Sequence, residues 1–403
     1  MLARLFLYVA LVGLISCTIF LVLALISIVR FWWRKRGVVF SQPGTWPRVT
    51  LLKPLCGMEP QLERSLESFF VQDYADFEII FGTRDAADPA LRVVNALRQR
   101  YPSVDVKVVY SGEPNHPNAK VCSLEKMIAA STSEYFVFSD SDVHVGQDYI
   151  YQVVRPLLDP EVGAVTCLYR GVPTGGIWSR LEALGMSVEM TSGVMTAELL
   201  EGMKFTLGPT MAMRREVLQQ TGGIGALAEF CSDDYLLGNR IAELGYKVVL
   251  SDYVIEHIVL NRSFLDSWLH QVRWMKSTRF SRPKGHLGTA LTFAMPFGIL
   301  GFYAARSLHD PMLGLALLAG ALANRLILSL VAGWGVVRDS NAVFYCWLYP
   351  LRDFLGFCFW SASYLGRTIV WRGEEYRLEF GGIMVRVDAE QAESAAIPAD
   401  RWA

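Results

Sequence analysis

Hydrophobic positions in this chain follow two patterns, long apolar runs near both ends and short apolar runs separated by polar segments in the middle. The first long run, residues 5–29, exceeds the ~20 residues that a helix needs to cross a bilayer. It is also longer than the ~7–15-residue core of a signal peptide, and a basic cluster lies on its far side, so we interpret it as a membrane anchor. Aromatic and basic residues follow at 30–36 (RFWWRKR), and the positive-inside rule then predicts a cytoplasmic location for the next segment.

Three further apolar runs lie toward the C-terminus, at residues 287–303, 313–337 and 354–371. Pro296 and Gly298 interrupt the first of them, so the pattern leaves open whether it crosses the bilayer or only enters it. Arg325 lies inside the second run, and Arg352 and Asp353 precede the third. Charges at membrane depth are costly, so we expect these side chains to face protein or one another and treat them as functional candidates.

The middle of the chain alternates strand-like and helix-like segments. Runs rich in β-branched and aromatic residues predict strands at 49–52, 77–81, 104–110, 135–138, 163–168, 208–213 and 246–250. Helical segments are predicted at 60–70, 90–100, 120–130, 148–158 and 264–280. This order predicts a doubly wound α/β domain with a parallel sheet, whose strand ends are available for ligands. Residues 181–203 are Met-rich but too charged to span, which leaves open a helix against the membrane and a plain core helix.

The predicted domains are a membrane anchor with its basic flank (1–36), an α/β domain (37–284), C-terminal membrane helices (285–371) and a polar tail (372–403) with strand character at its start. With 52% hydrophobic residues and a mean hydropathy of +0.28, the chain is too apolar for an ordinary soluble enzyme. The net charge of −1 gives no indication of nucleic-acid binding. Seven scattered cysteines without a CxxC pair indicate free thiols in a reducing compartment.

The strand-like run that starts at Tyr135 ends in two carboxylates one residue apart, Asp140 and Asp142. Both would lie at the carboxyl end of a strand, where open α/β sheets bind ligands. Mg²⁺ takes one or two carboxylates and leaves its other positions to water and phosphate oxygens, so the pair suits a hard divalent cation. The triplet alone leaves an Asp-rich turn open as the alternative.

Two later segments also carry candidate chemistry. Asp233 and Asp234 open an amphipathic helix, where the helix dipole favours acids whatever the protein does, so their position alone does not establish a catalytic role. The helix predicted at 264–280 carries His270, Arg273 and Trp274 on a basic and aromatic face, which suits a polyphosphate or a membrane surface.

A series of motifs occurs in a fixed order over residues 49–280. They are VTLL at 49–52 with Pro54, SFFVQDY at 68–74, Asp85, the triplet from Asp140 to Asp142, Asp234, and the Arg273-Trp274 pair. Together they resemble the membrane-bound inverting glycosyltransferases of the GT-A fold. The closer resemblance is to the ceramide glucosyltransferase family and its bacterial relatives that glycosylate hopanoids.

The resemblance implies a role for each matched acid. Asp85 would recognise the uracil and ribose of a UDP-sugar donor. Asp140 and Asp142 would bind the donor and a Mg²⁺ or Mn²⁺ ion, with Asp142 as the direct metal ligand and Asp140 facing the sugar nucleotide. Asp234 would be the general base that takes the proton of the acceptor hydroxyl, with Asp233 as the less favoured neighbour.

The resemblance also covers three basic positions and one aromatic. Lys120 matches a position near the donor, Arg273 would contact the diphosphate, and Trp274 would lie by the acceptor or the sugar. The last family motif is usually Gln or Arg, two variable residues, then Arg-Trp, whereas this chain has His270 at the first position. A histidine can donate a hydrogen bond to phosphate and would add a pH dependence, and a His that only fills a helix face is the alternative.

The resemblance implies an integral, multi-pass membrane enzyme with a cytoplasmic GT-A domain, in the inner membrane if the source is bacterial. It would transfer a sugar, glucose first, from a UDP-sugar to a lipid hydroxyl such as that of ceramide, giving a β-glycoside. The alternatives are transfer of N-acetylglucosamine or another hexose to a hopanoid, and a processive polysaccharide synthase, which would need more spans. A polyprenyl phosphate sugar transferase would need no strong base, and a non-catalytic scaffold would be expected to lack the acids.

Overall fold

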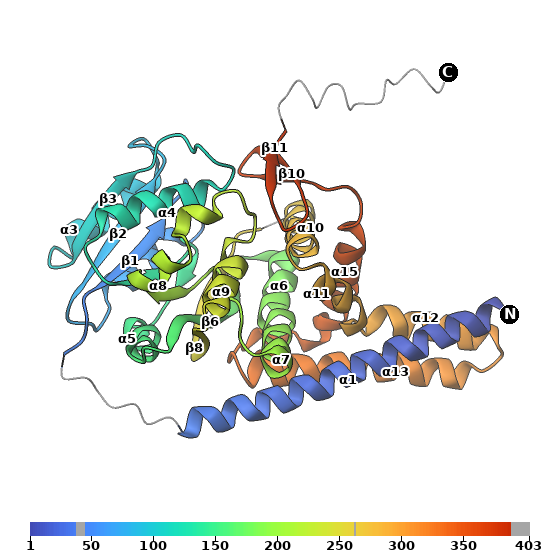
Figure 1. Cartoon of the computed structure of the whole chain (residues 1–403). Coiled ribbons are helices and arrows are strands. Elements are labelled where there is room, and N and C mark those ends of the chain that lie inside the picture. Colours follow the sequence, from blue (N-terminus) through green and yellow to red (C-terminus); the bar gives the residue numbers. More distant parts are fainter. Residues whose placement is uncertain (38–44, 262, 388–403) are drawn as a thin grey trace, which may run out of the picture.

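The structure, a computed structural model, describes residues 1–37, 45–261 and 263–387. An α/β domain occupies one end of the molecule, and the long apolar helices extend from the other end (Figure 1). Helices α6 (Gly176–Leu184), α7 (Thr191–Glu201), α10 (Phe264–Ser281), α11 (Pro283–Thr289) and α15 (Tyr349–Ala362) lie between them.

The α/β domain is built on an eight-stranded sheet with the order β3-β2-β1-β4-β7-β6-β8-β5. Its strands are β1 (Val49–Pro54), β2 (Phe77–Thr83), β3 (Asp105–Tyr110), β4 (Tyr135–Phe138), β5 (Val143–His144), β6 (Val162–Pro173), β7 (Met211–Arg214) and β8 (Lys247–Val259). Strands β3, β2, β1 and β4 are parallel, and so are β6 and β8. The α/β fold class is confirmed, but the sheet is mixed rather than fully parallel, because β7 runs antiparallel to both of its neighbours and β5 runs antiparallel to β8.

Alternation along the central strands explains why helices cover both faces of the sheet. Leu51 and Leu52 are both fully buried but belong to opposite cores, because successive side chains of a strand point to opposite faces. One core includes side chains of α2 (Leu62–Phe70) and α3 (Ala90–Arg100). The other includes side chains of α4 (Ala119–Ala130), α8 (Arg215–Gln220) and α9 (Asp233–Glu243).

Strands β6 and β8 are much longer than the runs that predicted them. Their second halves carry charged residues, which hide the strand pattern in the sequence. In the structure, Glu256 on β8 pairs with Arg170 on β6 at 2.7 Å and with His144 on β5 at 3.1 Å. These ion pairs between neighbouring strands allow the charged positions to remain in the sheet.

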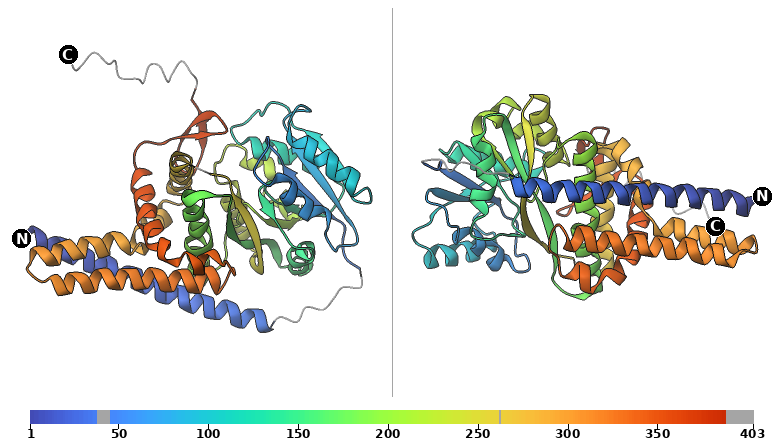
Figure 2. Two further views of the ribbon diagram at one scale, coloured as in Figure 1. Left: turned by 180° about the vertical axis from the view of Figure 1, so that it is seen from behind. Right: turned by 90° about the horizontal axis from the view of Figure 1, so that it is seen from below.

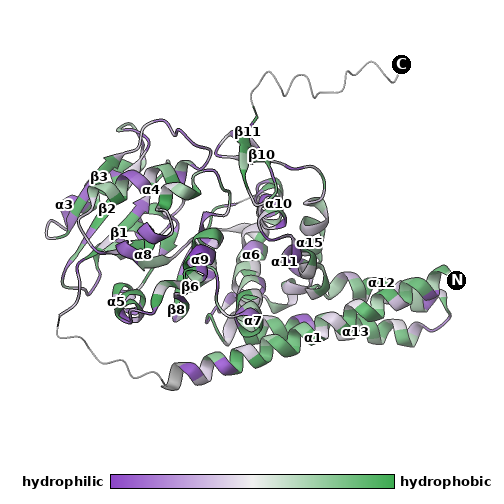
Figure 3. Cartoon of the chain, viewed as in Figure 1, coloured by the Kyte–Doolittle hydropathy of each residue, from purple (hydrophilic) through white to green (hydrophobic). Residues whose placement is uncertain are grey.

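Two helices are long and apolar enough to cross a membrane, residues 2–34 within α1 (Leu2–Gly37) and residues 311–334, which begin with α13 (Pro311–Leu328). A third candidate is the pair formed by residues 283–292 and α12 (Met295–Ser307), which bends by 49°. Both views in Figure 2 show α1 lying alongside α12 and α13, and Figure 3 shows their apolar character. The anchor prediction therefore agrees with the length and composition of α1.

The last predicted apolar run, 354–371, differs from the expectation. Helix α15 ends at Ala362, and the chain passes Gly366, whose φ is +75°, into strand β9 (Thr368–Trp371). The helix has already ended four residues before Gly366, and this glycine allows the turn into β9, so the run is a short helix and a strand rather than one span. With β10 (Glu374–Leu378) and β11 (Met384–Arg386), β9 forms a small antiparallel sheet, as the strand character after Arg372 predicted.

The segment 181–203 packs as core helices, which is the second of its two interpretations. Helices α6 and α7 are continuous through a π-helical stretch, residues 185–190, and most of their side chains are buried. Glu198 on α7 pairs with Arg34 on α1 at 2.5 Å. The segment therefore connects the α/β domain to the anchor.

Candidate active site

Asp140 lies where β4 leaves the sheet. The last backbone bond toward β1 runs from the Ser139 amide to the Leu52 carbonyl, and Asp140 then turns toward the start of α4. Its Oδ1 lies 2.6 Å from Lys120 Nζ. Burial alone would lower the pKa of Lys120, but the charges of Asp140 and of Asp233 and Asp234 raise that pKa above its usual range. The structure therefore brings the predicted donor residues Lys120 and Asp140 together as an ion pair.

Asp234 is held at the start of α9 by two backbone amides. Its Oδ2 accepts from the Gly208 amide at 2.8 Å, and its Oδ1 accepts from the Tyr235 amide at 2.8 Å. Burial and the charge of Asp233 outweigh these bonds and raise the pKa of Asp234 to about 6. A carboxylate with this pKa is ionised near neutral pH and is more basic than an ordinary aspartate.

Gly208 marks the space that Asp234 and Asp140 share. A Cβ atom added to Gly208 would lie 3.2 Å from Asp234 Oδ2 and 3.7 Å from Asp140 Oδ2. The two carboxylates, which come from distant parts of the sequence, therefore face the same small volume. No side chain other than hydrogen fits there without displacing one of them.

The Gly208→Ala protein is expected to keep its fold and lose most of its turnover. The added methyl group would displace the Asp234 carboxylate by a few tenths of an ångström, and rates are sensitive to such shifts, since a 1 Å misplacement of a catalytic group costs roughly 100-fold. Thermal unfolding and kcat measured on the same preparation test this. Ala in place of Gly193, which has open space for a Cβ, is the matched control, and equal kcat values for the two variants would contradict the prediction.

Asp233 and Asp234 point to different partners. Asp233 is buried, its Oδ1 accepts from Asn118 Nδ2 at 3.3 Å, and its Oδ2 has no hydrogen-bond partner among the described residues. Asn118 also caps α4 through the Val121 amide, so Asp233 faces the start of that helix. Only Asp234 is placed against Gly208, which agrees with its choice as the base.

Asp142 is the more deeply placed acid of the triplet. Its Oδ2 lies 3.7 Å from His257 Nε2, and its buried Oδ1 has no hydrogen-bond partner within the described chain. Burial raises the pKa of Asp142. An ionised carboxylate is costly to bury when one of its oxygens has no hydrogen-bond partner. A divalent cation would satisfy this orphaned oxygen.

No group of three or more His, Cys, Asp or Glu side chains in residues 1–37, 45–261 and 263–387 is arranged to hold a metal ion. A nucleotide-associated Mg²⁺ or Mn²⁺ ion takes only one or two carboxylates from the protein and its other ligands from phosphate and water. The donor set of Asp142 and Asp140 therefore fits the predicted ion.

Four residues that the sequence did not single out also lie at this site. Lys53 at the end of β1 is fully buried, and its Nζ donates to the Asp140 carbonyl at 2.5 Å. Burial lowers the pKa of Lys53 to about 7. Burial and the charge of Asp142 raise the pKa of Glu59 to about 7, and His257 and Tyr169 adjoin the same acids. A lysine that ends an apolar strand was a usable signal, whereas His257 lies in the hidden half of β8.

The remaining predicted residues are placed around the acids without direct contacts to them. Asp85 is exposed in the loop after β2, and its Oδ1 accepts from the Ala87 amide at 2.7 Å. Nothing in the described chain joins it to Asp140, although both follow strands at the same edge of the parallel half of the sheet.

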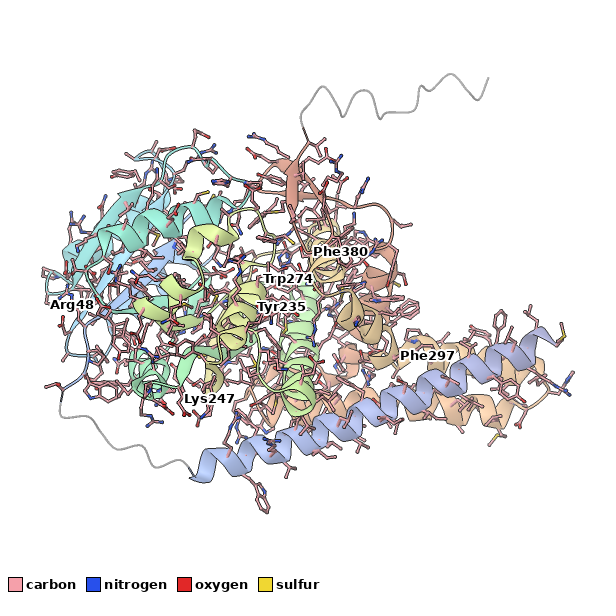
Figure 4. The ribbon with its side chains drawn as sticks, in the orientation of Figure 1. Arg48, Tyr235, Lys247, Trp274, Phe297 and Phe380 are labelled. Carbon is pink, nitrogen blue, oxygen red and sulfur yellow. The ribbon has the colours of Figure 1, made fainter. Side chains whose placement is uncertain are left out.

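His270 and Trp274 lie on α10, with ring centroids 4.5 Å apart. His270 Nδ1 lies 2.7 Å from Oε1 of the buried Glu182, which fixes the ring orientation. Figure 4 shows Trp274 in the region between the sheet and α10, near Tyr235 of α9 in that view. Arg273 is half-buried, and its guanidinium lies 5.9 Å from the ring of Trp371.

Comparison with known proteins places the chain among glycosyltransferases. Residues 14–384 match a family model described as glycosyl transferase family 21. The chain is 23% identical to ceramide glucosyltransferase 1 of Caenorhabditis elegans over 385 residues, 93% of this chain and 81% of that protein. It is 40% identical to the ceramide glucosyltransferase of Komagataella phaffii over 101 residues, 24% of this chain and 20% of that protein.

Among solved structures, a mannosyltransferase of Pyrobaculum calidifontis with GDP-mannose and Mn²⁺ is similar at a TM-score of 0.45 and 20% identity. The match covers 86% of this chain and 99% of that one. A glucosyl-3-phosphoglycerate synthase of Mycobacterium tuberculosis, solved with Mn²⁺, UDP-glucose and phosphoglyceric acid, is similar at a TM-score of 0.39 and 18% identity, over 60% of this chain and 85% of that one.

Proposed function

Because the chain belongs to glycosyl transferase family 21, we propose that it transfers a sugar, glucose foremost, from a UDP-sugar to the hydroxyl of a membrane lipid such as ceramide. The relatives named ceramide glucosyltransferase support this choice of sugar and acceptor. The observation that supports the proposal is that the Asp234 and Asp140 carboxylates both face Gly208, as a general base and a donor-binding acid of one site would.

Asp234 acts as the general base in the proposed reaction. Its carboxylate takes the proton of the acceptor hydroxyl while that oxygen attacks the anomeric carbon, and the bond from this carbon to the diphosphate oxygen breaks. One displacement inverts the anomeric configuration, so an α-linked donor gives a β-glycoside. The Gly208 and Tyr235 amides hold the carboxylate in place while it accepts the proton.

Asp142 and Asp140 would hold a Mg²⁺ or Mn²⁺ ion, which supplies charge neutralisation for the departing diphosphate when bound. Lys120 fixes the orientation of Asp140 through their 2.6 Å ion pair. Lys53 donates a hydrogen bond to the backbone carbonyl of Asp140 and so helps to fix its position. Asp85 would recognise the uridine, and Arg273 with Trp274 would close the site from α10, with His270 oriented by Glu182.

A lipid acceptor fits the position of the site relative to the membrane helices. Helix α7 contacts the anchor helix α1 through the Glu198–Arg34 ion pair, and the chain segment after α7 carries Gly208. Leu265 and Leu269 on α10 and Leu287 on α11 are each about 60% exposed. They indicate an apolar surface on α10, the helix that carries the Arg273-Trp274 pair, and on the adjoining α11. We propose a multi-pass membrane protein with its α/β domain on the cytoplasmic side, as the basic flank of α1 indicates.

The full-length protein in lipid vesicles tests this function. Vesicles with ceramide and UDP-glucose are expected to give a glucosylated lipid, identified by mass spectrometry, and EDTA is expected to abolish its formation. Mg²⁺ or Mn²⁺ should restore it, because the metal balances charge that the protein does not. Transfer at full rate in EDTA would contradict the metal assignment.

A panel of donors and acceptors separates the alternatives. UDP-N-acetylglucosamine or UDP-galactose as the preferred donor would change the sugar, and a hopanoid as the preferred acceptor would change the lipid. A product with many sugars would instead indicate a polysaccharide synthase. Transfer to undecaprenyl phosphate in preference to every lipid hydroxyl would overturn the role of Asp234.

A further inference from the structure

The turn between β9 and β10 has an unusual residue for its geometry. Trp371 and Glu374 are paired across the two strands, so Arg372 and Gly373 form a two-residue hairpin turn. Both have positive φ, +53° and +83°, as a type I′ turn requires. Glycine and asparagine suit these positions, and a side chain such as arginine there costs roughly 1 kcal/mol. The turn geometry itself therefore does not explain the arginine.

The hairpin belongs to the small sheet of β9, β10 and β11, which is fixed to two parts of the active site. Its C-terminal side bonds the segment before Asp233, with Cys231 N to Gly382 O at 2.9 Å and Met384 N to Glu229 O at 2.8 Å. Its N-terminal side bonds α10, where Lys276 Nζ donates to the Thr368 carbonyl at 2.8 Å. Figure 1 shows the small sheet standing over the interval between the α/β domain and α10. Each attached segment carries residues of the candidate site.

These attachments bring Arg372 near Arg273, whose guanidinium lies 5.9 Å from the ring of Trp371, the residue before Arg372. Burial lowers the pKa of Arg273 to about 10, and the charge of Arg372 acts in the same direction. The charge of Arg372 also acts on Glu59, which adjoins Asp142. Within the described residues, neither Arg273 nor Arg372 has a carboxylate within ion-pair distance, whereas Arg377 and Arg386 of the same sheet are paired with Glu379 and Glu374. Two neighbouring arginines without acidic partners are the arrangement that binds a polyvalent anion.

We propose that Arg372 binds the diphosphate of the nucleotide-sugar donor together with Arg273, and that the C-terminal hairpin is a fixed wall of the donor site. The inference rests on the proposed function for the identity of the anion. The fork of donors on each guanidinium suits phosphate oxygens, and both cations would stabilise the negative charge that UDP gains as the sugar leaves. Arg273 of α10 and Arg372 of the hairpin would then bind the diphosphate oxygens, while Asp140 and Asp142 would hold the divalent cation.

Nucleotide binding to the full-length protein tests the inference without any need for turnover. With Mg²⁺ present, Arg372→Gly is expected to raise the Kd for UDP by roughly 10- to 100-fold and leave the Kd for uridine unchanged, because only UDP carries the diphosphate. Glycine suits the turn, so the thermal unfolding temperature should stay the same or rise. Arg377→Gly is the matched control on the same sheet and should leave both Kd values unchanged.

The outcomes separate the two proposals. Unchanged UDP affinity in Arg372→Gly, or an equal loss for UDP and uridine, would overturn the role of Arg372 while leaving the transferase function in place. An equal loss in Arg377→Gly would show that the hairpin acts only through its fold, which also overturns the direct contact. A wild-type protein that binds no UDP would overturn the proposed function itself, and the inference with it.

Discussion

Replacing Asp234 with Asn is expected to lower kcat by roughly 10²- to 10⁴-fold and leave the Kd for UDP unchanged. Asn has nearly the same shape as Asp but cannot take a proton from the acceptor hydroxyl. Its one side-chain oxygen can still accept from either the Gly208 amide or the Tyr235 amide, so one of the two bonds at the start of α9 is kept. Vesicle assays of lipid product and calorimetry with UDP measure the two quantities on one preparation.

Asp148→Asn is the matched control, because Asp148 is an exposed acid at the start of another helix, α5 (Tyr149–Val154), and lies outside the site. It should transfer sugar at the wild-type rate. If Asp234→Asn also did so, Asp234 would not be the base. A variant that lost UDP binding along with turnover would point to a structural rather than a proton-transfer role.

The pH profile gives an independent measure of the same group. With a pKa of about 6, Asp234 is ionised above pH 6 and protonated below it, so kcat should fall about tenfold for each pH unit below 6. The charge of Asp233 contributes to the raised pKa of Asp234. Asp233→Asn should therefore lower that pKa and move the acidic limb of the kcat profile, the part below pH 6, to lower pH. A limb that stays in place would mean that another group controls the rate.

Much of the fold could be predicted because its signals are local. Strands β1, β2 and β4 are short apolar runs that are buried on both faces of the sheet, so composition alone marks them. Asp140 and Asp142 were predictable for the same reason, since they follow a buried strand directly. The antiparallel direction of β7 was not, because it depends on the path through α6 and α7 and leaves no local trace.

The rest of the site depends on contacts between distant segments. Gly208 reads as an ordinary turn glycine until Asp140 and Asp234 are placed on either side of it. His257 lies in a half-strand whose polar residues are paired across the sheet, so its period-two pattern is masked. Arg372 belongs to a tail whose strand character was evident, but its position opposite Arg273 follows only from the docking of the small sheet.

The charges inside the C-terminal apolar runs were treated as functional candidates from the sequence, and the structure gives them a clear structural use. Arg325 and Asp353 are each 2% exposed, and Arg325 Nη1 lies 2.8 Å from Asp353 Oδ1. The other carboxylate oxygen accepts from the Ala294 and Met295 amides, so Asp353 also caps the first turn of α12. One ion pair therefore connects α12, α13 and α15.

The residue next to Asp353 also contacts α10, the helix that carries Arg273 and Trp274. Arg352, next to Asp353 on α15, donates to Gln271 Oε1 on α10 at 2.8 Å and pairs with Glu189 at 3.0 Å. Arg273 is two residues from Gln271, so the position of the Arg-Trp motif depends on α15 being held in place. Loss of the Arg325–Asp353 pair should therefore disturb the site from a distance.

Arg325→Met is expected to destabilise the protein by about 3–5 kcal/mol, because it leaves the Asp353 charge buried without its partner. The double variant Arg325→Met/Asp353→Asn should recover a large part of that loss, since Asn keeps one acceptor for the α12 amides and carries no charge. Unfolding in detergent or vesicles of the wild type, Arg325→Met, Asp353→Asn and the double variant gives the four free energies of a double-mutant cycle. Arg306→Met, at an exposed arginine of α12, is the control and should have little effect. If the single and double variants were equally unstable, the cost would lie in packing around Arg325 rather than in an unpaired charge, and α15 would be held to the other membrane helices by contacts other than this pair.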